Sequence, residues 1–218
     1  MRHVLLSNDD GIDAHGLNLV ADVLAERNDL RVTIVAPTEQ QSASSHSLTL
    51  RIPLRVVEYG PGRYGVTGTP TDCVLVAMEY ILKNDPPDLV ISGVNHGSNM
   101  GEDVTYSGTV AAALEGAILG LPSYALSCAS WHPRHWGAVE SYLRHHLDDL
   151  LDVPLEKHSL LNVNIPDVPA EEIKGIRAAP LGSRRYKDAI TEQIDPRGRP
   201  YLWIGGTGPT WDDIPGTD

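Results

Sequence analysis

Two adjacent acidic residues, Asp9 and Asp10, follow an apolar run near the start of the chain, in the stretch LLSNDDG. Gly11 comes next and lets the backbone turn. Neighbouring side chains of a strand point to opposite faces, so both carboxylates reach one point only after the chain has left the strand. Two close carboxylates disfavour joint ionisation unless a cation compensates, and oxygen ligands favour Mg²⁺ or Mn²⁺. The alternative is that one Asp caps a helix and the other is solvated.

A polar, Ser-rich loop at residues 38–47, TEQQSASSHS, could complete such a site. Ser42 offers a neutral oxygen ligand, and a small set of protein ligands leaves room for water and substrate oxygens. His46 could donate to a phosphoryl oxygen or protonate a leaving group. Taken alone, Ser42 is more typical of an ordinary loop hydroxyl.

A third polar loop, NHGSN at residues 95–99, follows another predicted strand. Asn95 is a second candidate for a neutral oxygen ligand, and His96 is a second candidate for a phosphate or leaving-group donor. Asn99 lies in the same loop. Taken alone, Asn95 and Asn99 are more typical of turns beside glycine.

An alanine-rich helix is predicted to open at Ser107, directly after the third loop. The first N–H groups of a helix are free and its dipole favours anions, so Gly108 and the hydroxyls of Ser107 and Thr109 predict a phosphate cradle. The alternative is a plain helix cap.

The elements that must position these loops alternate between β-branched runs and amphipathic stretches, which favours an α/β fold. We expect a Rossmann-like, three-layer core with a mostly parallel sheet over residues 1–170, and a small β-rich extension over 171–218. In such a sheet, ligands bind outside the carboxyl ends of the strands, where all three polar loops begin. The expected strands cover 3–7, 31–37, 87–93, 122–128 and 160–166, with paired extended segments at 48–60 and 63–68 and helices at 13–27, 71–83, 107–120 and 133–151.

Composition limits the classes of function. The 218 residues carry a formal net charge of −12, which argues against binding to a nucleic-acid backbone. Neither a membrane span nor a signal peptide is predicted. Cys73 and Cys128 lie in apolar surroundings and are expected to be buried, reduced thiols. We therefore expect a cytoplasmic protein with no nucleic-acid or membrane partner.

Taken together, these motifs resemble the SurE family of metal-dependent nucleoside 5′/3′-monophosphate phosphatases. The resemblance spans residues 2–218. The stretches that carry it are SNDDG, TIVAPTEQQSASSHS, GTPTDCV, ISGVNHGSNMGEDVTYSGTVAAALEGA and DPRGRPYLWIGG.

The resemblance implies hydrolysis of nucleoside 5′- and 3′-monophosphates to nucleoside and phosphate, and in some members shortening of polyphosphate. It implies one divalent ion per subunit, Mg²⁺ or Mn²⁺, and a homodimer or homotetramer that exchanges C-terminal elements. Residues 171–218 are then an oligomerisation arm, and the chain is expected to end earlier than other family members. The implied metal ligands are Asp9, Asp10, Ser42 and Asn95, and the neighbouring polar residues are Asn8, His46, Asn99, Ser107 and Thr109.

Asp9, Asp10 and His46 are the expected catalytic residues, and in-line attack by a metal-associated water is the favoured mechanism. A phospho-aspartyl intermediate is the alternative. A response-regulator receiver would need an acceptor Asp at the end of a later strand, but that strand ends in Ser92-Gly93. A nucleotide-binding domain without hydrolase chemistry would carry GxGxxG after the first strand, which NDDGIDAHG lacks.

Overall fold

The computed structural model describes residues 1–186, 190–205 and 209–218, which form two compact units. The first unit comprises residues 1–99 and 105–175, and the second comprises 100–104 and 176–218. Among the described residues, no helix has the length and apolar character needed to cross a bilayer.

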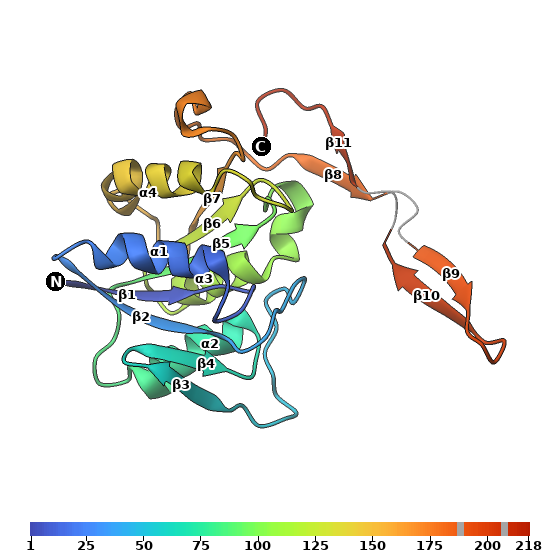
Figure 1. Ribbon diagram of the computed structural model, residues 1–218, viewed down its shortest axis with the longest axis horizontal. Helices are drawn as coiled ribbons and strands as arrows, with labels where there is room; N and C mark the ends of the chain where they lie inside the picture. The colour runs from blue at the N-terminus through green and yellow to red at the C-terminus, as the bar shows by residue number, and fades with distance from the viewer. Residues whose placement is uncertain (187–189, 206–208) are drawn as a thin grey trace. The chain divides into compact units, whose positions relative to one another are not determined.

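The first unit is built on one seven-stranded sheet with the order β3-β4-β2-β1-β5-β6-β7 (Figure 1). Neighbouring strands pair in parallel, except that β3 and β4 are antiparallel. The expectation of an α/β fold with a mostly parallel sheet is therefore confirmed. The strands are β1 (Arg2–Ser7), β2 (Leu30–Pro37), β3 (Val56–Gly60), β4 (Arg63–Val66), β5 (Leu89–His96), β6 (Ser123–Cys128) and β7 (Leu161–Ile165).

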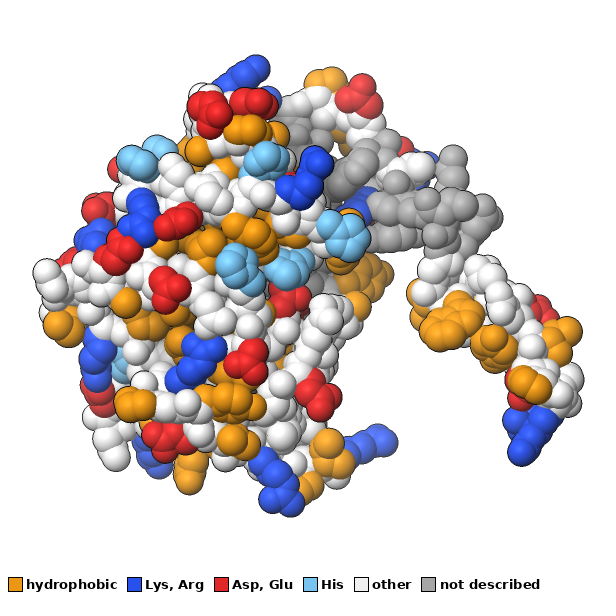
Figure 2. All heavy atoms as spheres, viewed as in Figure 1, with side chains coloured by type: hydrophobic (Ala, Val, Ile, Leu, Met, Phe, Trp, Pro, Cys, Tyr) orange, Lys and Arg blue, Asp and Glu red, His pale blue; other side chains and the backbone are white. Residues whose placement is uncertain are grey.

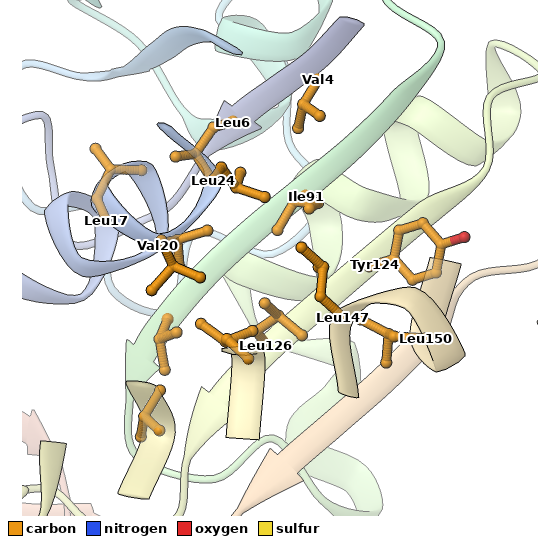
Figure 3. Close-up of a cluster of buried hydrophobic side chains, with 14 of the residues drawn as sticks. Val4, Leu6, Leu17, Val20, Leu24, Ile91, Tyr124, Leu126, Leu147 and Leu150 are labelled. Atoms are coloured by element: carbon orange, nitrogen blue, oxygen red, sulfur yellow. The ribbon is translucent and has the colours of Figure 1, made fainter. Parts of the chain in front are cut away.

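Helices cover both faces of this sheet, so the central strands β1, β5 and β6 are apolar on both sides. On one face, α1 (His15–Ala25) and α4 (Trp136–Leu151) bury a cluster that includes Leu17 and Leu147 (Figure 3). The other face carries α2 (Pro70–Val76), the π-helix η1 (Ala77–Ile81) and α3 (Gly108–Ile118). The chain also forms short 3₁₀ turns at Gly101–Thr105 (η2) and Ala170–Glu172 (η3).

The order of the strands brings the three polar loops to one edge. From β1 the chain first adds β2 on one side, and it later adds β5 on the other. Because these three strands are parallel, their carboxyl ends meet at the same edge, where the strand order reverses. This is the position at which open α/β sheets bind ligands.

Two expected elements differ in extent from the structure. The strand expected at 48–60 begins only at Val56, and Pro53 in the earlier part has no N–H to donate to a neighbouring strand. The helix expected at 71–83 begins at Pro70, where Thr69 and Asp72 form a capping box. It continues past Val76 as the π-helix to Ile81.

The second unit confirms the expected β-rich extension. Strand β8 (Ser183–Tyr186) pairs with β11 (Pro209–Asp212), and β9 (Ile190–Ile194) pairs with β10 (Pro200–Ile204), both antiparallel. In the first unit, Cys73 and Cys128 are buried free thiols, as expected.

The approach of α1 to β5 depends on Gly16. A Cβ atom at this position would lie 2.1 Å from the carbonyl oxygen of Val94. The variant Gly16→Ala must push α1 off the sheet, and we expect it to lower the free energy of unfolding by about 1–3 kcal/mol. Urea denaturation measures this loss.

Gly137→Ala is the matched control, because a Cβ at Gly137 in α4 would meet nothing within 4 Å. Alanine favours a helix over glycine, so this variant should keep or slightly raise the stability. Equal stability of the two variants would contradict the close contact at Gly16.

Candidate active site

Asn8 and Gly11 build the turn that follows β1. Asn8 is fully buried; its Nδ2 donates to the carbonyl of Gly11 at 2.9 Å, and its Oδ1 accepts from the Gly11 N–H at 3.2 Å. Gly11 has a φ of +104°, a conformation that favours glycine. The turn places Asp9 and Asp10 beyond the strand, and the Asn8 amide holds the turn itself. A contact of Asn8 with substrate stays a prediction.

Asp9 lies against the start of α3. Its carboxylate is 5% exposed and accepts hydrogen bonds from the hydroxyl and the backbone N–H of Thr109. Burial raises the pKa of Asp9 to about 6; the Asp10 charge acts in the same direction and the Thr109 hydrogen bonds act against both. The predicted start of α3 therefore lies in the site. Its Thr109, which was expected to bind phosphate, donates hydrogen bonds to the Asp9 carboxylate.

Gly108 allows this close approach. A Cβ atom on Gly108 would lie 2.7 Å from Asp9 Cβ, 2.8 Å from Ser44 Oγ and 3.0 Å from Asp9 Oδ2. The first polar loop, the second polar loop and α3 therefore converge at Gly108. Ser107 caps the helix, with its Oγ accepting from the Val110 N–H at 3.0 Å.

Asp10 joins the second and third polar loops. Gln40 Nε2 donates both to Asp10 Oδ1, at 3.3 Å, and to Ser42 Oγ, at 3.0 Å. The backbone N–H of His96 donates to Asp10 Oδ2 at 3.2 Å. The structure thus brings Ser42 close to Asp10 through Gln40, a residue that the sequence did not single out.

The remaining members of the third loop have different surroundings. Asn95 Nδ2 donates to the Gly97 carbonyl at 2.9 Å, and its Oδ1 accepts no hydrogen bond from the described residues. The His96 ring packs 5.2 Å from the Trp136 ring, and its buried Nε2 has no partner in the described part of the chain. Asn99 holds the loop on β6 and β7: it donates from Nδ2 to Ser127 Oγ at 2.8 Å and from its N–H to Asn164 Oδ1 at 2.8 Å.

His46 lies beside α3 rather than next to the paired acids. Its Nε2 is 2.7 Å from Glu115 Oε2, seven residues or about 10 Å along α3 from Gly108. In residues 1–186, 190–205 and 209–218 no hydrogen bond or ion pair joins His46 to Asp9 or Asp10. Its catalytic role stays a prediction, whereas its contact with Glu115 fastens the second loop to the helix. Glu115 was missed because an acidic residue within a helix carries no local signal.

The oxygen atoms at this edge fit a hard divalent cation. Asp9 and Asp10 form no ion pair with a Lys or Arg of the described residues, although Asp9 is buried. The described residues contain no cluster of three or more His, Cys, Asp or Glu suited to a metal. A cation would therefore use these two carboxylates together with neutral oxygens such as Asn95 Oδ1 and Ser42 Oγ.

Gly108→Ala tests the convergence of the first and second polar loops with α3. The added methyl group overlaps both Asp9 and Ser44, so the paired acids must move relative to α3. We expect a loss of about 10²-fold or more in the affinity for Mn²⁺, and a similar loss in any phosphate release that the site catalyses, because functional sites tolerate little displacement. Isothermal titration with Mn²⁺ and phosphate release measure the two quantities. Gly137→Ala is the control, and wild-type behaviour of Gly108→Ala would contradict this geometry.

Comparison with known proteins identifies the family of the chain. The model of the family described as "Survival protein SurE" matches residues 4–188. A 5′-nucleotidase SurE from Alkalilimnicola ehrlichii is 47% identical over 218 residues, covering 100% of this chain and 84% of the relative. Another from Gemmatimonas aurantiaca is 51% identical over 222 residues, covering 99% and 86%.

A solved structure extends the likeness to three dimensions. The crystal structure of the SurE protein from Aquifex aeolicus superposes with a TM-score of 0.83 at 38% identity, covering 99% of this chain and 87% of that one. Both the sequence and the fold therefore match over nearly the whole chain, and the chain belongs to the SurE family.

Proposed function

We propose that this protein is a 5′-nucleotidase, a hydrolase that depends on a divalent metal ion and releases phosphate from nucleoside 5′-monophosphates. Nucleoside 3′-monophosphates and short polyphosphate are further proposed substrates. The meeting of Asp9 with the start of α3 and of Asp10 with the third polar loop carries the proposal. The names of the SurE relatives support the reaction class.

The proposed metal ligands are Asp9, Asp10, Ser42 and Asn95, which hold one Mg²⁺ or Mn²⁺ ion. When bound, the ion would offset the carboxylate charge and part of the phosphate charge, and it would lower the pKa of a water molecule. The need for an ion is supported by the burial of Asp9, which forms no ion pair with a Lys or Arg of the described residues.

The chain's own groups would bind and orient the phosphoryl group. The Gly108 N–H has no partner among the described residues, and it lies at the positive end of the α3 dipole. Thr109 keeps Asp9 oriented, and the His96 N–H and Gln40 orient Asp10. These contacts hold the reacting groups at fixed positions before substrate arrives.

Phosphate release from AMP and 3′-AMP tests the proposal. With Mg²⁺ or Mn²⁺ we expect turnover, and chelation with EDTA should abolish it. Asp9→Asn should lose about 10²-fold or more in kcat/KM, because it removes a charged ligand at the reacting centre.

Asp13→Asn is the matched control, since Asp13 lies in the same loop with its side chain 83% exposed. It should keep wild-type activity. Turnover that survives chelation, or an active Asp9→Asn, would refute the metal-dependent reading.

We also propose that the β9–β10 hairpin binds a second copy of the chain. The register places Ile190, Ile194, Leu202 and Ile204 on one face, and each of these four side chains is more than half exposed. Glu192, the partner of Leu202, is the one charged residue on this face of the paired strands. Figure 2 shows exposed apolar side chains along the hairpin. A hairpin with an unburied apolar face favours association.

Leu202→Glu tests this surface by placing a charge on the apolar face. We expect the sedimenting mass to fall from that of a dimer or tetramer to that of a monomer. Thr191→Glu adds the same charge on the opposite face of the hairpin and should leave the mass unchanged. A wild-type monomer, or an unaltered mass for Leu202→Glu, would rule the surface out.

A reducing compartment, the cytoplasm, is the proposed location. It is supported by the two buried thiols, Cys73 and Cys128, which are not joined in a disulfide.

A further inference from the structure

The hydroxyl of Ser44 differs from its neighbours in the second polar loop. Its Oγ is inaccessible to solvent and has no hydrogen-bond partner among the described residues. Ser45 Oγ donates to the Thr105 carbonyl at 2.8 Å, and Ser47 Oγ donates to the Ser44 carbonyl at 2.7 Å. Buried hydroxyls are normally paired, so an unpaired one needs an explanation.

Ser44 Oγ packs against Gly108 at the start of α3, beside Asp9. The positions given above place it and Asp9 Oδ2 within about 3 Å of one point, where a Cβ of Gly108 would be. The adjacent N–H of Gly108 is also without a partner in the described residues. Two unpaired donors, one hydroxyl and one amide, therefore lie together at the start of α3, beside the proposed metal ligand.

The loop holds this hydroxyl in place at a conformational cost. Ala43 and Ser45, on either side of Ser44, have φ values of +56° and +53°, which non-glycine residues rarely adopt. The Ser45 N–H donates to the Tyr106 carbonyl at 3.1 Å, and His46 contacts Glu115 on α3. These contacts fasten the chain directly after Ser44 to the α3 region and so restrict the movement of its hydroxyl.

We propose that Ser44 is a further catalytic residue, whose Oγ–H donates to a non-bridging oxygen of the substrate's phosphoryl group next to the Gly108 N–H. The inference rests on the proposed phosphatase function and deepens it. A phosphoryl oxygen is a strong, charged acceptor and satisfies a donor that otherwise has none. This contact involves no proton transfer and no covalent bond, because the hydroxyl only orients and stabilises the phosphoryl group while it is transferred.

The test compares Ser44→Ala with the wild type, using inorganic phosphate as the probe. We expect the Kd for phosphate, measured calorimetrically with Mn²⁺ present, to rise about tenfold or more, the usual loss for a hydrogen bond to a charged group. The kcat/KM for AMP should fall by a similar factor. The Kd for Mn²⁺ measured without phosphate should stay within about twofold, because Ser44 is not assigned as a metal ligand.

Thermal unfolding without metal or phosphate supplies a readout independent of activity. Removing a buried donor without a partner should raise the Tm of Ser44→Ala by about 2–4 °C. Ser92→Ala is the control: Ser92 Oγ is also buried without a described partner, but it lies within β5. This variant should raise the Tm similarly and leave the Kd for phosphate unchanged.

Three outcomes would overturn the assignment. Unchanged phosphate affinity in Ser44→Ala, with an active wild type, would show that the hydroxyl does not touch the phosphoryl group. A selective loss of Mn²⁺ affinity would make Ser44 a metal ligand instead. A lowered Tm would show a structural role. A wild type that neither binds phosphate nor cleaves AMP would refute the proposed function itself.

Discussion

Asp9 carries a carboxylate that is almost completely removed from water and lies next to a second carboxylate, Asp10. Burying such a pair is unfavourable unless donors and a positive charge surround it. Thr109 supplies donors at the start of α3, where the helix dipole also favours an anion. A divalent ion would supply the positive charge that the described side chains do not provide.

The sheet makes this arrangement possible because it fixes where the loops start. Strands β1, β2 and β5 are parallel neighbours, so their carboxyl ends meet at one edge. The helices must then approach very closely. Glycine at positions 16 and 108 allows contacts with β5 and with Asp9 that any side chain would prevent. Close packing of rigid elements therefore sets the distances within the site, as functional groups of this kind require.

The second polar loop adopts locally unfavourable geometry. Two of its non-glycine residues, Ala43 and Ser45, adopt positive φ values, and between them Ser44 buries a hydroxyl without a described partner. Both features cost free energy in the unliganded protein. Such departures from favourable geometry are kept mainly at functional sites, and the rest of the fold supplies the stability that they cost.

The sequence by itself was sufficient for the class of fold and for the main chemical groups. Periodicity and β-branched runs predicted most strands and helices, because burial imposes a repeat that is visible locally. The sequence pattern was less successful at the ends of the elements, as the late start of β3 at Val56 shows. The paired acids stood out because two adjacent charges after an apolar run have few structural uses.

Only the tertiary structure decided which residues the polar loops contact. Gln40 bridges Asp10 and Ser42, and Glu115 receives His46, through contacts between segments that are 30 and 69 residues apart. No local pattern encodes such pairs, because a Gln in a loop or a Glu in a helix is ordinary until a distant segment packs against it. The charges were therefore predictable from the chain, whereas the partners that orient them depended on how the loops meet.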